Sequence, residues 1–228
     1  MKRLMDDLAF TWLSNSVIST PLFSDSHPMK LIDSVLEHLD LEQIETNLFR
    51  GMSEALGPPR VFGGQVIGQA LIAALRTVEG RPCHSLHGYF LRPGDPSIPI
   101  IYEVDRIRDG KSFTTRRVVA IQKGEAIFSM SASFQVFEDG LSHQVEMPDV
   151  PHPDDLPTEE EMFERRKKDM TPEMITMMKR DRPVEMKCVE DVDYLNPVKG
   201  EPVQHIWFRS KKKLGDDNAQ HQCLLAYA

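Results

Sequence analysis

The chain has 228 residues, of which 40% are hydrophobic and 27% are charged, and its formal net charge is −8. This composition is typical of a globular protein with a packed core. The negative charge argues against nucleic acid or an anionic membrane surface as the main partner. No stretch approaches the roughly twenty apolar residues that a membrane span needs. We therefore expect no nucleic-acid partner and no membrane partner.

The three cysteines, Cys83, Cys188 and Cys223, lie far apart and form no C-x-x-C pair. This spacing is typical of reduced thiols and not of a disulfide or zinc framework. The cysteines therefore predict a cytoplasmic location and no bound metal.

Residues 1–28 begin with two basic residues, but two aspartates follow and polar residues interrupt the apolar ones. A secretory leader has a cleaner apolar run than this. We interpret the segment as a poorly ordered extension ahead of the first domain, with a targeting role as the alternative.

An amphipathic helix is expected from about Pro28 to Leu39, and a strand over residues 44–53.

The next predicted helix is apolar on nearly all sides. Between Val66 and Val78 the apolar residues then recur all round the helix instead of on one stripe. Such a helix must be buried on most sides, and at this length it is too short to cross a bilayer.

Four strands are expected to cover this helix, over residues 84–92, 98–108, 112–123 and 126–137. Asp109-Gly110 and Lys123-Gly124 predict tight hairpins between the last three. In the final strand, apolar residues alternate with a serine-rich set, which indicates one face toward a core and one face that is wet or partnered. These features predict an α+β domain in which an antiparallel sheet curls around the apolar helix.

The composition changes after Gly140. Residues 141–183 are rich in proline and charge and are expected to be a linker with a surface helix, because Thr158 and Glu161 form a capping box. The methionines are interpreted as the buried side of that helix, with a methionine-rich partner groove as the alternative; they are Met174, Met177 and Met178. Strands over 183–190 and 203–213 indicate that another domain begins.

Several separated motifs carry a family resemblance. They are "LFRGMSEALGPPRVFGGQVIGQALIAA", "HSLHGYFLRPGDPSIPIIYEVDRIRDGKSF", "IFSMSASFQ", "NPVKG", "IWFRS" and "HQCLLAYA". In this order and spacing they resemble the acyl-CoA thioesterase II family, which has a double hotdog fold. The resemblance implies an N-terminal hotdog over 29–140 and the incomplete start of a second over 184–228. It further implies that "CLLAYA" lies where the second central helix is about to start, so that the chain is a fragment.

The resemblance also implies a chemistry. In this family an Asp at the start of the second central helix, a Thr or Ser, and a Gln position a water that attacks the thioester carbonyl. By the resemblance all three lie past Ala228, so this chain is expected to be an inactive fragment of an enzyme that hydrolyses fatty acyl-CoA without a cofactor. Asp216 and Asp217 precede the motif and are interpreted as loop or N-cap residues.

Within the first domain, Gly63, Gly64, Gln65 and His87 are the expected substrate-binding residues. The two glycines allow a ligand close to the backbone where the helix begins, and free N–H groups there favour negative charge. The alternative is that they only permit tight packing. Gln65 stands where the second half would carry its acid, and an amide cannot act as a base near neutral pH.

His84 and His87 have side chains suited to acid–base work, but on a strand they are expected to point to opposite faces, which disfavours a metal pair. The alternative is one histidine at a seam between sheets and one in the core. Arg92 could contact CoA phosphates or pair with Asp95. The basic run 209–215 could also meet phosphates or lie in a solvated loop.

Two rival functions remain open. One is a hotdog enoyl-CoA hydratase or dehydratase, which needs an acid–histidine pair at the mouth of the helix. The other is a non-catalytic module that binds acyl-CoA or supports assembly. Under each reading an exposed sheet edge favours pairing, so a homo-oligomer formed through hotdog sheet packing is expected.

Overall fold

The computed structural model describes residues 30–53, 60–179, 182–193 and 195–228, so the expected N-terminal extension lies outside the described residues. The chain divides into two compact units. The first, here called the sheet unit, combines Asp33–Leu141 with Asp216–Ala228. The second unit is built on Ser142–Gly215.

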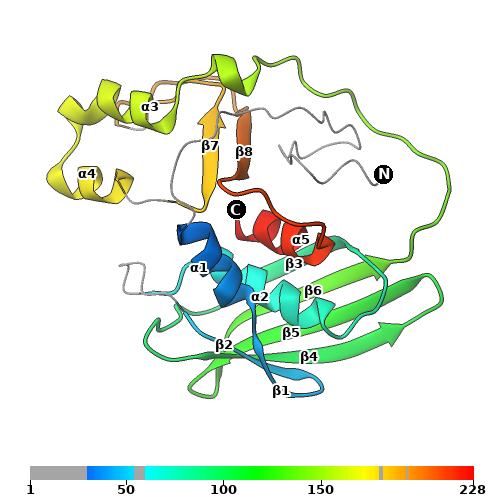
Figure 1. Cartoon of the computed structure of the whole chain (residues 1–228). Coiled ribbons are helices and arrows are strands. Elements are labelled where there is room, and N and C mark those ends of the chain that lie inside the picture. The colour runs from blue at the N-terminus through cyan, green and yellow to red at the C-terminus, as the bar shows by residue number, and fades with distance from the viewer. Residues whose placement is uncertain (1–29, 54–59, 180–181, 194) are drawn as a thin grey trace. The chain divides into compact units, whose positions relative to one another are not determined.

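The sheet unit contains one antiparallel six-stranded sheet, in the order β1-β2-β4-β5-β6-β3 (Figure 1). Its strands are β1 (Glu42–Glu45), β2 (Leu48–Gly51), β3 (Cys83–Phe90), β4 (Ile100–Asp109), β5 (Phe113–Gln122) and β6 (Glu125–Gln135). The single strand expected over 44–53 is wrong. The chain turns at Thr46, whose N–H donates to the Glu45 carboxylate at 2.8 Å, and β1 and β2 form a hairpin instead.

The predicted hairpins are confirmed. Lys123 and Gly124 have φ values of 50° and 79°, the left-handed pair that a two-residue connection between β5 and β6 requires. At the connection from β4 to β5, the Gly110 N–H donates to the Phe113 carbonyl at 2.8 Å.

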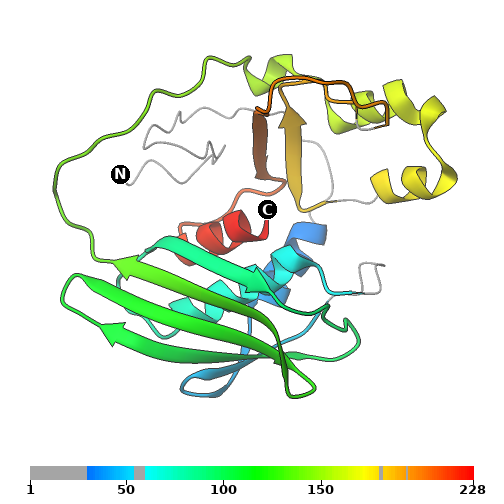
Figure 2. The same cartoon turned by 180° about the vertical axis from the view of Figure 1, so that it is seen from behind.

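Helix α2 (Gly63–Leu75) lies against the inner face of the sheet, and both views show it on one side of the strands (Figures 1 and 2). Its side chains from Ala70 to Ala74 are buried, and so are the inner-face residues of β6, Phe128, Met130, Ala132 and Phe134. The prediction of a sheet wrapped around an apolar helix is confirmed. Each large aliphatic side chain buried there contributes about 1.5–3 kcal/mol to folding.

The helix ends at Leu75, earlier than the Val78 expected, because Thr77 folds back on it. Both the N–H and the hydroxyl of Thr77 donate to the Ala74 carbonyl, at 3.0 and 2.8 Å. The preceding helix α1 (Lys30–Leu39) buries Val35 and Leu39.

The other side of α2 is covered by α5 (Asn218–Tyr227). Asp217 caps this helix, accepting from the Ala219 N–H at 2.9 Å, which confirms its interpretation as an N-cap residue. The Gln222 amide fastens α5 to β3 by exchanging two hydrogen bonds with the Cys83 backbone, at 3.1 and 2.7 Å. The helix begins at Asn218, ahead of the "CLLAYA" segment at which a helix start was expected.

The second unit contains two α-helices, two 3₁₀ turns and a two-stranded antiparallel sheet among its described residues. These are η1 (Pro153–Asp155), α3 (Glu159–Arg166), η2 (Lys167–Asp169), α4 (Pro172–Met178), β7 (Val184–Cys188) and β8 (Ile206–Ser210). The capping box at the start of α3 is confirmed. The prediction for the methionines is wrong, because they lie on the separate helix α4, where Met174 and Met178 are exposed.

Two buried side chains of the two-stranded sheet hydrogen-bond to the backbone around η1 in the second unit. The buried Lys187 ammonium donates to the Pro153 carbonyl at 2.8 Å, and the Trp207 indole donates to the Pro151 carbonyl at 3.1 Å. All three cysteines are free, as predicted. Within the described ranges, no helix has the length and apolar character needed to cross a bilayer.

Candidate functional site

The first turn of α2 is where the sequence places most of the expected substrate-binding residues. Phe62 precedes the helix in an extended conformation and gives it no side-chain cap. The turn therefore begins without the serine, threonine or aspartate oxygen that usually satisfies its N–H groups.

Gly64 brings the end of α5 into contact with this turn. A Cβ atom built on Gly64 would lie 2.1 Å from the Tyr227 carbonyl oxygen, far inside contact distance. The Phe62 and Tyr227 rings also meet, with centroids 5.1 Å apart. The missing side chain of Gly64 therefore serves helix–helix packing in this structure.

Gly63 has a different neighbour. Its Cβ would lie 2.9 Å from the tip of the Phe90 ring, which comes from the inner face of β3. Met52, Phe62 and Phe90 are each about half exposed, at 58%, 46% and 59%. An apolar rim, defined by these three side chains, thus surrounds the first turn of α2.

Two buried glutamines on α2 hold the chain that follows β2. The Gln65 and Gln69 amides donate to the same Met52 carbonyl, at 3.0 and 2.9 Å. Gln69 also donates to the His38 carbonyl at 2.6 Å and accepts from the Tyr102 hydroxyl at 2.7 Å. Burial raises the pKa of Tyr102 well above its usual value, so the hydroxyl stays a donor. Gln65 therefore fixes the entry to the helix from a buried position.

The two histidines of β3 correct an expectation. A bulge between Cys83 and Ser85 inserts one extra residue in β3, which changes the alternation of faces. His84 bonds to the Ser133 hydroxyl at 2.9 Å, and His87 lies opposite Ser131. Both side chains therefore lie exposed on the serine-rich outer face, and neither is a core residue.

The outer position of His87 separates it from the other expected site residues. Its ring packs edge-on against Tyr89, with centroids 4.8 Å apart, on the face of the sheet opposite α2. Gly63, Gly64 and Gln65 lie together on the inner side. The structure brings these three together and does not bring His87 to them.

Arg92 does not pair with Asp95, so that expectation is wrong. Arg92 instead lies 3.5 Å from the Glu125 carboxylate and donates to the Ala126 carbonyl at 2.8 Å. Asp95 pairs with Lys123 at 2.9 Å. Hydrogen bonds from Ser97 and Lys123 hold the pKa of Asp95 well below its usual value.

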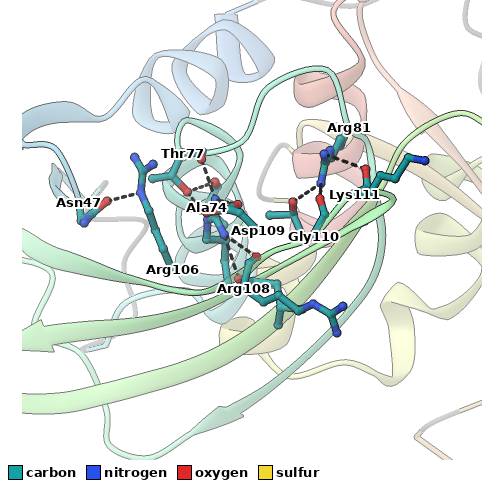
Figure 3. Close-up of polar contacts among 12 residues, drawn as sticks. Asn47, Ala74, Thr77, Arg81, Arg106, Arg108, Asp109, Gly110 and Lys111 are labelled. Carbon is teal, nitrogen blue, oxygen red and sulfur yellow. Dashed lines mark hydrogen bonds and ion pairs between the residues drawn. The ribbon is translucent and has the colours of Figure 1, made fainter.

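A cluster of four arginines lies at the other end of α2, and the sequence did not predict it (Figure 3). This arginine cluster consists of Arg76, Arg81, Arg106 and Arg116. Arg116 of β5 is only 1% exposed. Its guanidinium donates to the Thr77 hydroxyl and carbonyl, the Arg108 and Thr115 carbonyls and the Asp109 carboxylate, at 2.6–3.1 Å. One signal in the sequence could have revealed it. Arg116 alternates with Thr114 and Val118 along β5, so a charged side chain falls on the inner face of the strand.

The described residues contain no group of three or more histidine, cysteine, aspartate or glutamate side chains placed to hold a metal ion.

Comparison with known proteins identifies the family. The family profile "Acyl-CoA thioesterase N-terminal domain" matches residues 53–135. Acyl-CoA thioesterase 2 of Haemophilus influenzae is 38% identical over 198 residues, which cover 86% of this chain and 69% of that protein. Human acyl-coenzyme A thioesterase 8 is also 38% identical, over 83% of this chain and 62% of its own length.

Solved structures agree with this assignment. Acyl-CoA thioesterase II TesB2 from Mycobacterium marinum is 45% identical and superposes with a TM-score of 0.65, over 85% of this chain and 66% of that one. A hot dog fold protein from Alicyclobacillus acidocaldarius, at 20% identity and a TM-score of 0.58, shares the fold. The chain spans about two thirds of the length of these relatives. Its sheet and central helix form a hotdog, and the chain belongs to the acyl-CoA thioesterase II family.

Proposed function

We propose that the protein of this chain hydrolyses acyl-CoA thioesters to a free fatty acid and CoA. The observation that carries the proposal is the crossing of α5 over the first turn of α2, in a chain of this family. In the reaction, water oxygen adds to the thioester carbonyl carbon, the carbon–sulfur bond breaks, and the CoA sulfur leaves as a thiol with a proton from the water.

The direction of α5 explains how two hotdogs could share one site. Its first turn lies near the end of α2, beside Leu75 and Arg76, and its last residue lies over Gly64. The two helices are therefore antiparallel. Residues following Tyr227 in a longer chain would emerge near the start of α2. The resemblance implies the family's catalytic Asp a couple of residues past Ala228, and we propose that it lies beside this turn. We assign no catalytic residue within residues 1–228.

The proposed roles of the first domain follow from this placement. Gly63, Gly64 and Gln65 form the wall of the site on the inner side of the sheet, where they border the reacting group. The apolar rim of Met52, Phe62 and Phe90 contacts the acyl chain, which gains affinity by removing apolar surface from water. His87 contacts substrate only where a ligand reaches the outer face of β3.

The wider organisation is proposed from the same features. Strands β7 and β8 are the opening strands of a second hotdog, after a linker over 141–183. Edge strand β3 carries exposed Tyr89 beside polar residues, which supports association through sheet packing. The free cysteines support a cytoplasmic location. The hydratase alternative loses support, because His84 and His87 lie on the outer face and not at the mouth of α2.

The test is a thiol-release assay on saturated acyl-CoAs of several chain lengths, using the full-length protein. We expect CoA and free acid in equal amounts, and little turnover by residues 1–228 alone. His87→Ala is expected to leave kcat nearly unchanged, because its ring lies on the face of the sheet opposite α2. It is expected to raise KM severalfold, because it removes the substrate contact proposed at the outer face of β3.

His84→Ala is the matched control, since it removes the same ring from the same strand and face. No CoA release at any chain length would refute the proposed hydrolysis. Equal effects of the two histidine variants on KM would refute the role given to His87.

A further inference from the structure

A pocket of about 370 Å³ opens beside the arginine cluster, at the end of α2 opposite Gly64. It is lined by Arg76, Thr77, Val78, Glu79, Arg81, Arg106, Asp109, Thr114 and Arg116, all from the sheet unit. These residues come from the turn after α2 and from the β4–β5 hairpin (Figure 3). None of them belongs to the site proposed for thioester hydrolysis.

The charge of this pocket is opposite to that of the chain. The lining holds four arginines and two acidic residues, a net of two positive charges although the whole chain carries −8, and Arg76 also pairs with Asp40 outside this lining. One acid, Asp109, hydrogen-bonds to Arg116, and its pKa is lowered mainly by that bond and less by the charge of Arg106. Concentrating positive charge in a concave surface attracts anions.

Arg106 is the arginine best placed to meet a ligand. Its Nε donates to the Asn47 side-chain oxygen at 2.8 Å, which orients the guanidinium (Figure 3). Its two terminal amino groups make no hydrogen bond to the residues described. A guanidinium fixed at Nε, with both terminal groups available, suits bidentate contact with a phosphate.

Arg81 is fixed on the other side of the pocket by the hairpin backbone. It donates to the Gly110 and Lys111 carbonyls at 2.9 and 3.1 Å and to the Thr114 hydroxyl at 2.5 Å. Holding these side chains in place before binding lowers the entropy lost when a ligand arrives. The pocket thus offers preorganised positive groups, and neither Arg106 nor Arg81 forms an ion pair with an acid among the described residues.

A larger cleft of about 750 Å³ adjoins this pocket and shares Arg76, Val78 and Arg81 with it. Apolar side chains form much of its lining, namely Leu36, Leu39, Ile72, Leu75 and Pro82, and the acids Asp40 and Asp217 lie at the same cleft. A ligand that fills both would therefore combine phosphate groups with a flat or apolar part.

We propose that the 370 Å³ pocket beside the arginine cluster, here called the arginine pocket, binds the phosphate groups of a nucleotide. The base of the nucleotide lies toward the adjoining cleft. Two sources share this chemistry: the nucleotide part of CoA and a free adenine nucleotide. The first source rests on the function proposed above, whereas the second does not.

The test is calorimetric titration of the full protein with CoA, with adenosine 3′,5′-bisphosphate and with inorganic phosphate. We expect both nucleotides to bind and Arg106→Ala to weaken them about tenfold or more, since a hydrogen bond to a charged group contributes about 1.5–3 kcal/mol. Arg108→Ala is the matched control, because Arg108 is on the same strand but does not line the pocket. It should change affinity less than twofold.

Arg106→Lys is expected to recover part of the lost affinity, because it keeps the charge without the bidentate geometry. If Arg106→Ala raises the KM for acyl-CoA while kcat is retained, the nucleotide is that of the substrate. If it abolishes binding of the free nucleotide without changing hydrolysis, the ligand is a free nucleotide. Binding that is absent, or equal in the Arg106 and Arg108 variants, overturns the proposal, whether or not hydrolysis occurs.

Discussion

Arg116→Met is expected to lower the free energy of unfolding of the sheet unit by about 3 kcal/mol. Methionine keeps much of the buried volume but donates no hydrogen bond. The Thr77, Arg108 and Thr115 carbonyls then lose a buried donor, and a buried group left unsatisfied costs about 1–3 kcal/mol. Urea denaturation followed by circular dichroism measures the change.

Two variants separate this effect from simple loss of charge. Arg117→Met removes a neighbouring arginine whose pairing with Asp105 is exposed, and it should cost less than about 1 kcal/mol. Asp109→Asn should also cost little, because its side chain is 57% exposed. Equal destabilisation by the Arg116 and Arg117 variants would contradict the role assigned to the buried guanidinium.

Gly64→Ala is expected to destabilise the sheet unit by about 2–3 kcal/mol, through overpacking against the Tyr227 backbone. Alanine favours a helix over glycine by about 1 kcal/mol, so the clash must exceed that gain to show a net loss. The displaced group is backbone, which cannot rotate away as a side chain could. The same urea titration measures the result.

A graded set of alanine substitutions provides the control. At Gly68 the Cβ would meet the flexible Leu39 side chain at 3.0 Å, so the loss should be smaller than at Gly64. At Gly140 the Cβ would meet nothing within 4 Å, and alanine should be tolerated. A Gly64→Ala protein as stable as the unsubstituted chain would show that α5 does not cross at this position.

Local patterns were sufficient for the architecture of the first domain. The apolar residues on all sides of α2 predict that the helix is buried on most sides. The alternation in β6 predicts one apolar sheet face, and a sheet wrapped around the helix buries both. The Lys123-Gly124 turn and, in the second unit, the Thr158 capping box each depend on residues adjacent in sequence, and both are present as predicted.

The errors arose where a contact between distant segments decides the outcome. The bulge at His84 depends on the register of β3 against β6, and a one-residue insertion reverses which face a side chain occupies. The pairing of Arg92 with Glu125 instead of Asp95 depends on the same alignment of β3 with β6, which continues at Leu91 and Arg92. Gln69 bonds to groups 17 to 33 residues away, and Arg116 bonds to Thr77, 39 residues away, so no local pattern could reveal these partners.

Hydrogen–deuterium exchange of the α2 amides tests the central claim most directly, that an apolar helix is enclosed between the sheet and α5. Amides from Ala70 to Ala74 should exchange only through unfolding of the whole sheet unit, whereas those of the largely exposed helix α3 should exchange through local opening. Slow exchange of α2, with rates that track the global unfolding free energy in urea, is the predicted result. Exchange of α2 as fast as that of α3 would contradict the account.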